Sequence, residues 1–158
     1  MRRLDRFKAE SKENTLVRWY KRQNPLKIMR NYMLLGLSNV LVFPSIKRLL
    51  WRLCGAKVGK NVIIGPRVGM DFFFPELITI GDNCIIGFQA TILAHEFLMD
   101  EWRRGKVEIG KNVVIGTGAT ILPGVKIGDK AIIGAKALVM DNVPAGQTWV
   151  GVPARKLR

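Results

Sequence analysis

Aliphatic residues recur at every sixth position over much of the second half of the chain. Isoleucine-glycine pairs begin at positions 109, 115, 127 and 133, and the same grid continues through positions 121, 139, 145 and 151. The period also appears at positions 80, 86 and 92, and again at 58 and 64. A second small or aliphatic residue follows most of these by four places. A period of six fits neither an α-helix nor a heptad repeat, so the pattern predicts a stacked repeat structure.

Each six-residue unit predicts one short strand with its aliphatic side chain turned into a common core. The glycine that follows tolerates a tight corner before the next strand. Three units close one triangular turn of about eighteen residues, and stacked turns pair with each other as parallel strands. We therefore predict an all-β parallel β-helix over residues 57–158, preceded by a basic and partly apolar helical segment, residues 1–56.

The six-residue grid is interrupted near Asp71 and again after Ile92. After Ile92 the next unit should begin at residue 98, but the next clean start is Ile109. A loop of about residues 97–108 is therefore expected to leave the coil, with His95 and Glu96 at its mouth. Glu96 occupies a position where the core pattern requires a small residue, and such a local inconsistency is typical of a working site. The spacing alone is equally compatible with a half-buried histidine that only anchors the loop.

Several segments of the repeat resemble one enzyme family. They are I-G-D-N at 80–83, I-G-K-N at 109–112, I-L-P-G-V at 121–125 and the ending G-V-P-A-R at 151–155. Together they resemble the hexapeptide-repeat acyltransferases with left-handed β-helix folds, particularly the galactoside, maltose and xenobiotic O-acetyltransferases. The resemblance covers roughly residues 55–158. The repeats specify only the fold, because nucleotidyltransferase tails and γ-class carbonic anhydrases share them; the loop histidine together with the ending is more specific.

The resemblance implies an acetyltransferase that uses acetyl-CoA and assembles as a homotrimer with its sites at the subunit boundaries. His95 matches the family's catalytic histidine, which acts as general base on an acceptor hydroxyl. Glu96 is a candidate for the carboxylate that orients the imidazole. Asp71 lies near the place where relatives carry a polar residue that binds the acceptor hydroxyl; as an alternative, it is a turn residue.

The same resemblance implies which residues hold coenzyme A. Backbone groups of the final coils, at Thr117, Gly118 and Ala135, match those that bind pantetheine, and the cations Lys136, Arg155 and Arg158 match the phosphate end. One departure stands out, because relatives commonly have Thr-Lys where this chain has Val139-Met140. The terminal cations are also compatible with a frayed basic end.

The cysteines and the single histidine restrict other chemistry. Cys84 falls on an inward position and Cys54 on a helix end, so neither is expected to be a nucleophile. One histidine per chain cannot supply the three imidazoles of a γ-class zinc site. No metal is therefore expected.

Charge is concentrated in the first third of the chain. The whole sequence has 26 Lys and Arg against 12 Asp and Glu, which gives a net charge of +14, and most of the excess lies before residue 57. Residues 31–46 carry no formal charge, but this run is shorter than the roughly 20 residues that a membrane-spanning helix needs. One or two short helices are expected in residues 1–24.

A further helix is predicted to begin at Pro44 and end before Gly55. Its apolar stripe would comprise Ile46, Leu49, Leu50 and Leu53. This helix is expected to cap the open first coil, whose edge would otherwise pair with another chain.

Two interpretations of the basic segment remain open at this point. It packs on the β-helix or between subunits, or it lies peripherally on an anionic membrane surface. Nucleic-acid binding is not expected, because no recognised module accompanies the charge. The lack of a signal peptide and the low cysteine content favour the cytoplasm.

The predicted function is transfer of an acetyl group from acetyl-CoA to a hydroxyl of a sugar or cell-envelope glycan. The alternatives are N-acetylation of an amino sugar and a catalytically silent β-helix scaffold.

Overall fold

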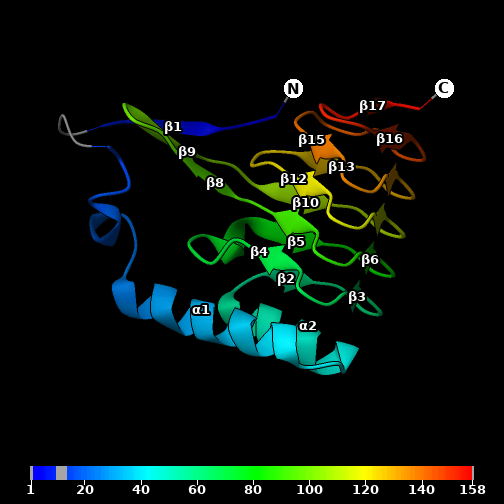
Figure 1. Cartoon of the computed structure of the whole chain (residues 1–158), viewed down its shortest axis with the longest axis horizontal. Helices are drawn as coiled ribbons and strands as arrows, with labels where there is room; N and C mark the ends of the chain where they lie inside the picture. The colour runs from blue at the N-terminus through cyan, green and yellow to red at the C-terminus, as the bar shows by residue number, and fades with distance from the viewer. Residues whose placement is uncertain (1, 10–13, 158) are drawn as a thin grey trace.

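The computed structural model describes residues 2–9 and 14–157, and the six-residue units form a left-handed β-helix of three parallel sheets (Figure 1). Face 1 consists of β2 (Lys57–Val58), β5 (Ile78–Ile80), β10 (Val107–Ile109) and β13 (Lys126–Ile127). Face 2 consists of β3 (Ile63–Ile64), β6 (Ile85–Ile86), β11 (Val114–Ile115), β14 (Ile132–Ile133), β16 (Thr148–Val150) and the antiparallel β17 (Arg155–Lys156). Face 3 consists of β4 (Gly69–Met70), β7 (Thr91–Ile92), β12 (Thr120–Ile121) and β15 (Leu138–Val139).

The register of the sheets follows the predicted period. Ile109 of β10 pairs with Ile127 of β13, one uninterrupted turn later along the chain. Ile80 pairs with Ile109 across a longer interval, because the loop after face 3 is inserted in that turn. The inward aliphatic residues are buried along all three faces, and Cys84 is buried among them. The predicted β-helix and its core positions up to Val139 are thus confirmed. The grid positions 145 and 151 are exposed instead, because the last turn is shorter and Ile127 bridges to Val143.

The reason for the repeated glycine differs from the one expected. The left-handed backbone conformation falls two residues later, at Asn83 (φ 57°) and Asn112 (φ 56°). The glycine itself is required by close stacking of the coils, since a Cβ atom added to Gly81 would lie 2.6 Å from the carbonyl oxygen of Gly110. Most of these corners are therefore made by an asparagine or another polar residue, although Gly118 and Gly124 make two of them, and the repeated glycine allows the next coil to approach.

Two helices cover the first coil at one end of the β-helix (Figure 1): α1 (Pro25–Val40) and α2 (Pro44–Cys54). Asn24 caps the start of α1 by accepting a hydrogen bond from the backbone N–H of Leu26. Gly55 ends α2 with a left-handed φ of 114°. The predicted start, end and capping position of α2 are confirmed.

The buried face of α2 is not the predicted one. Leu50 is buried, but Ile46, Leu49 and Leu53 are exposed, and Trp51 and Cys54 face the core instead. The physical reason is that the basic residues between the leucines bind the edge of the first coil.

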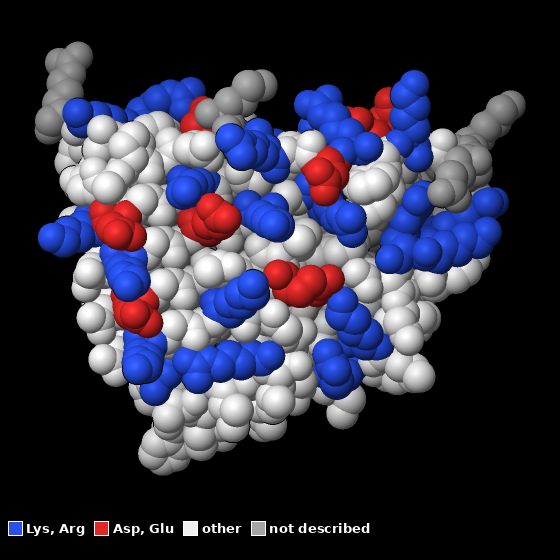
Figure 2. Space-filling model, turned by 180° about the vertical axis from the view of Figure 1, so that it is seen from behind, with Lys and Arg blue, Asp and Glu red and all other residues white. Residues whose placement is uncertain are grey.

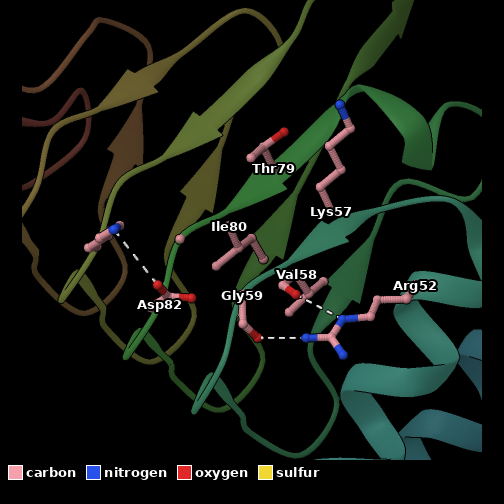
Figure 3. A pocket seen from close by; sticks show the side chains of 9 residues that line it. Arg52, Lys57, Val58, Gly59, Thr79, Ile80 and Asp82 are labelled. Carbon is pink, nitrogen blue, oxygen red and sulfur yellow. Dashed lines mark hydrogen bonds and ion pairs between the residues drawn. The ribbon is translucent and has the colours of Figure 1, made fainter.

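Three cations of α2 satisfy backbone carbonyl groups at the open edge of the first coil. Lys47 Nζ donates to Gly65 O, and Arg48 Nη1 donates to Val62 O. Arg52 donates from Nε to Val58 O at 2.8 Å and from Nη2 to Gly59 O at 2.9 Å, beside a cavity of about 370 Å³ (Figure 3). Because these carbonyl groups have no strand below them, the cations supply the hydrogen-bond donors that a further coil would supply.

The prediction of one or two short helices in residues 1–24 was wrong for most of the described residues of this segment. Residues Trp19–Lys21 form a single 3-10 turn, η1, whereas Asp5–Lys8 form the strand β1. β1 pairs antiparallel with β9 (Glu101–Arg104), which pairs in turn with β8 (His95–Phe97). Stacking of Phe7 on Trp102, with ring centroids 4.2 Å apart, explains why the extended form is preferred.

The loop that leaves the coil is therefore a β-hairpin with a third strand added from the N-terminus. It begins at His95 itself, and face 1 resumes at Val107. A second, shorter departure from the coil lies one turn earlier and contains the 3-10 turn η2 (Pro75–Leu77). No helix in the described residues is long and apolar enough to cross a membrane.

Candidate functional site

His95 lies directly against Asp71 at the corner where both departures leave face 3. The imidazole Nδ1 is 2.5 Å from Asp71 Oδ2. The two residues come together because β4 and β7 are paired, so the residue after Met70 lies beneath the segment after Ile92. The side chain of His95 is 15% exposed, and that of Asp71 is fully buried.

Backbone amides fix the Asp71 carboxylate on both oxygen atoms. Oδ1 accepts hydrogen bonds from the N–H groups of Phe73 (2.9 Å) and Phe74 (3.0 Å). Oδ2 accepts one from Ala94 N–H at 2.8 Å, in addition to its contact with His95. Short aspartate side chains commonly bind the amides two and three residues ahead in this way. The carboxylate therefore cannot swing away from the imidazole.

This arrangement determines which nitrogen atom of His95 is free. An ionised carboxylate only accepts hydrogen bonds, so the imidazole Nδ1 carries the hydrogen and donates it to Asp71. The other nitrogen, Nε2, is then unprotonated in the neutral ring and can accept a proton. Asp71 thus both orients the ring and selects its tautomer.

Aromatic rings surround the imidazole. The ring centroids of Phe73 and Phe97 lie 4.8 and 4.7 Å from that of His95, and the Phe74 centroid lies at 5.5 Å. Phe73 and Phe74 belong to the turn that binds Asp71, whereas Phe97 lies two residues after His95 on the same face of β8. The same local structure therefore positions the carboxylate and encloses the ring.

Glu96 does not contact the imidazole. Successive residues of a strand point to opposite sides, so Glu96 of β8 points away from the side that His95 occupies. Its carboxylate accepts a hydrogen bond from Arg2 Nη1 at 2.7 Å and lies 3.8 Å from Arg103 Nη1. The carboxylate at His95 is Asp71, which sequence reasoning had placed on the acceptor side.

The predicted pantetheine-binding residues lie together at another corner of the coil. Thr117 and Gly118 precede β12, and Ala135 and Lys136 precede β15, so the two turns are stacked. Lys136 N–H donates to Thr117 O at 2.8 Å. The Lys136 side chain lies over Gly118. A Cβ atom added to Gly118 would be 2.9 Å from Lys136 Nζ.

This corner and His95 are separated within one chain. The turns precede the strands of face 3, whereas His95 follows a strand of the same face. The two groups therefore occupy different corners of the triangular cross-section.

Of the predicted phosphate ligands at the C-terminus, Arg155 is exposed in β17 and donates to Ala154 O at 2.9 Å. Arg158 lies outside the described residues.

Both cysteines are buried and free. Burial raises the pKa of the Cys54 thiol to about 11, partly offset by Arg30, and burial also raises the pKa of Cys84. Raised pKa values keep the thiols protonated, which fits the expectation that neither is a nucleophile. Within the described residues, no three His, Cys, Asp or Glu side chains are grouped to hold a metal ion.

One group of residues beside His95 was not predicted. Tyr32, Gly36 and Asn39 of α1 line a cavity of about 410 Å³ that His95 and Asp71 also line. These three residues lie in the uncharged run 31–46, whose pattern indicated only that it is unsuited to cross a membrane.

Comparison with known proteins identifies the family. The model for bacterial transferase hexapeptide (six repeats) matches residues 106–140, and that for the hexapeptide repeat of succinyl-transferase matches residues 77–92. The Bacillus subtilis (strain 168) protein named "Putative acetyltransferase YvoF" is 43% identical over 156 residues, which cover 98% of this chain and 90% of that protein. A similarly named Staphylococcus aureus (strain MSSA476) protein, SAS0727, is 39% identical over 92% of this chain and 91% of its own length.

Solved structures agree with these matches. A galactoside acetyltransferase in complex with coenzyme A superimposes with a TM-score of 0.68 at 27% identity, over 85% of this chain and 80% of that one. A maltose O-acetyltransferase from Clostridium difficile 630 has the same fold, with a TM-score of 0.62 at 22% identity over 85% of this chain and 88% of that one. Similarity along nearly the full length to named acetyltransferases, together with the repeat fold, shows that the chain belongs to the hexapeptide-repeat acetyltransferase family.

Proposed function

We propose that the protein transfers the acetyl group of acetyl-CoA to a hydroxyl group of a sugar or cell-envelope glycan, with His95 as general base. The observation that carries this proposal is the contact between His95 Nδ1 and the buried Asp71 carboxylate. A histidine whose tautomer is selected by a carboxylate is suited to accept a proton from a weakly acidic hydroxyl.

The proposed mechanism assigns one proton movement in each direction to His95. Acetyl-CoA supplies the acetyl group as an activated thioester. Nε2 accepts the hydroxyl proton of the acceptor while the acceptor oxygen forms its bond to the acetyl carbon. The carbon-sulfur bond then breaks, and the imidazolium returns the proton to the thiolate. Asp71 stabilises the imidazolium between these steps, and no acyl-enzyme is needed.

The residues at the other corner fit one end of a coenzyme A molecule. Lys136 and Arg155 are exposed cations, as phosphate groups require. The turns at Thr117, Gly118 and Ala135 present backbone at the surface beside Lys136. We assign the pantetheine arm to these turns and the phosphates to the two cations.

The activity is tested by incubating the full chain with acetyl-CoA and a panel of sugars and amino sugars, with thiol release and product mass as readouts. Mild alkaline hydroxylamine removes an ester-linked acetyl group but leaves an amide. Removal therefore supports O-acetylation, whereas an alkali-stable product would establish the N-acetyl alternative. Absence of both coenzyme A binding and thiol release would favour the silent scaffold.

We further propose a homotrimer in which neighbouring chains complete each site. The separation of His95 from the Lys136 corner supports this proposal, because a second chain can bring its corner to the histidine of the first. A row of exposed aliphatic side chains on face 2 also supports it. Ile63, Ile85 and Ile132 are 44%, 49% and 45% exposed. The three side chains lie in one row across the paired strands, with Val114 between Ile85 and Ile132.

Ile85→Glu is expected to convert the trimer to monomers. Ile85 points outward, so the substitution leaves the core intact, but assembly would bury an unpaired carboxylate at a cost of roughly 3–5 kcal/mol. Light scattering after size-exclusion chromatography measures the mass, and the matched control is Thr79→Glu on the outer side of face 1. An unchanged trimer in Ile85→Glu, or a wild-type protein that is monomeric, would contradict the proposed assembly.

The basic segment has surfaces that support the proposed peripheral contact with an anionic membrane. Residues 25–54 contain five Lys and Arg and no Asp or Glu. Met33, Val40 and Leu49 are among their exposed apolar side chains. The end of the molecule where α1 and α2 lie carries no charged side chain at its tip in Figure 2, and basic side chains lie above it. The location we propose is cytoplasmic, which suits the free thiols of Cys54 and Cys84.

Val40→Asp is expected to reduce cosedimentation with phosphatidylglycerol-containing vesicles severalfold. Val40 is 80% exposed at the end of α1, so an acidic residue there opposes both insertion and attraction to anionic lipid. Met140→Asp, on the β-helix, is the control. Equal pelleting of wild type with neutral and anionic vesicles, or pelleting that Val40→Asp leaves unchanged, would contradict the proposed contact with an anionic membrane.

A further inference from the structure

The cavity beside His95, here called the α1 cavity, lies between helix α1 and face 3 of the β-helix. Its volume of about 410 Å³ is in the range of small-molecule sites. Leu35 and Gly36 contribute to the helix wall, and Met70 and Leu93 contribute to the β-helix wall. The cavity therefore adjoins the His95 side chain, which accepts a proton in the proposed mechanism.

The lining of the α1 cavity is uncharged except at the catalytic corner. Lys and Arg are absent from its lining, and the Asp71 carboxylate is already occupied by three backbone amides and His95. The remaining polar side chains are Tyr32, Asn39 and Thr91. Aliphatic and aromatic surface makes up the rest. Such a lining favours an apolar group and offers no Lys or Arg to a phosphate or a carboxylate.

Gly36 keeps the helix wall open. It lies inside α1, where glycine is less favourable than alanine because it loses more conformational freedom on folding. No atom lies within 4 Å of a Cβ atom added at Gly36, so packing does not require the glycine. Its effect is to leave space on the cavity side of the helix.

The helix wall is held in a defined position relative to His95. Asn31 of α1 is fully buried, and its Nδ2 donates to Phe72 O at 3.0 Å. The Tyr32 and Phe72 rings meet edge to face with centroids 5.8 Å apart. Phe72 directly follows Asp71, so α1 is attached to the same turn that orients the histidine. The cavity is thus a formed site with fixed walls.

We propose that the α1 cavity is an acceptor subsite that takes an uncharged apolar group, such as an alkyl chain, attached next to the hydroxyl that is acetylated. This assignment rests on the proposed function of His95 and specifies its acceptor as an apolar-substituted alcohol or glycoside. Tyr32, Gly36 and Asn39 determine the specificity, and the space at Gly36 admits the apolar group.

The test compares binding of two uncharged probes, hexyl and methyl β-glucopyranoside, by ligand-observed NMR titration. Wild type is expected to bind the hexyl probe about tenfold more tightly or better, because several additional CH₂ groups leave water. Gly36→Leu fills the cavity with a strong helix former and is expected to remove this preference while coenzyme A binding stays unchanged. Gly36→Ala and Leu37→Phe are the controls, and both should keep the preference.

The titration is repeated with His95→Ala protein, which separates this inference from the catalytic proposal. Retention of the hexyl preference in His95→Ala supports the subsite whether or not acetyl transfer depends on His95. Equal binding of the two probes by wild type, no binding of either, or a preference that survives Gly36→Leu would each overturn the proposal.

Discussion

Replacing His95 by alanine is expected to lower the rate of acetyl transfer by about 10²–10⁴-fold while leaving coenzyme A binding unchanged. The ring is the only described group at this corner that can accept a proton through an accessible nitrogen, because Asp71 is buried and saturated with donors. The fold should persist, since Asp71 keeps its three backbone amide partners in the variant. Thiol release and isothermal titration with coenzyme A measure the two quantities.

His95→Asn and Glu96→Gln sharpen this comparison. Asparagine can still donate a hydrogen bond toward Asp71 but offers no base, so it should be as inactive as alanine. Glu96 is directed to Arg2 and Arg103, so Glu96→Gln should retain activity within about threefold, because the glutamine side-chain oxygen still accepts the hydrogen bond from Arg2. Transfer by His95→Ala at close to the wild-type rate would remove His95 from the mechanism.

Asp71→Asn is expected to lower the turnover number by about 10²–10⁴-fold, with little change in coenzyme A binding. If the amide oxygen keeps the bonds from Phe73 and Phe74, the amide nitrogen faces the N–H of Ala94 and Nδ1 of His95. The amide N–H of the new side chain and the imidazole Nδ1–H would then point at each other. The imidazole therefore carries its hydrogen on Nε2 instead, and Nε2 can no longer accept a proton. Loss of the bond at Ala94 should also lower the free energy of unfolding by about 1–3 kcal/mol.

The tautomer can be observed directly, because His95 is the single histidine of the chain. Its imidazole ¹⁵N resonances need no assignment, and they should report hydrogen on Nδ1 in wild type and on Nε2 in Asp71→Asn. A variant that only loosened the structure would lose stability without this exchange. An unchanged tautomer combined with wild-type turnover would show that Asp71 acts only as a structural residue.

The β-helix could be predicted because its pattern is local and strictly periodic. One inward aliphatic every six residues defines strand, face and core together, and Ile109, Ile115 and Ile121 occupy the three faces in order. The role of the glycines could not be read in the same way. It depends on the distance between stacked coils, which appears only once Gly81 lies over Gly110.

The candidate site was predicted in its histidine but not in its carboxylate. His95 and Glu96 were found at a break in the grid, and Glu96 was the candidate for the orienting carboxylate because it stands where the core pattern requires a small residue. Pairing of β4 with β7 decides otherwise, because it stacks the break after Met70 beneath the break after Ile92. Two interruptions that follow paired strands of the same face bring the side chains after those strands next to each other. Both interruptions can be seen in the sequence.

Helix α2 shows where amphipathic patterning fails. Its leucines suggested the buried face, yet Lys47 is buried and Leu49 and Leu53 are exposed. The helix lies on an edge of unpaired carbonyl groups as well as on the apolar core, so hydrogen-bond donors are required on the inner face beside Trp51 and Cys54. The two ends of the helix could be predicted from its capping residues. Which of its side chains face inward depends on the surface that the helix covers.

The pairing of β1 restricts the order in which parts of the molecule can fold. Contacts between successive coils join residues that are near in sequence, so the β-helix can form coil by coil. Asp5 pairs with Arg104, by contrast, and this pairing cannot form until nearly two thirds of the chain has been synthesised. Arg2 reaches Glu96 beside the histidine by the same route. Strand β1 can therefore join the hairpin that carries His95 only after the chain as far as Arg104 is in place.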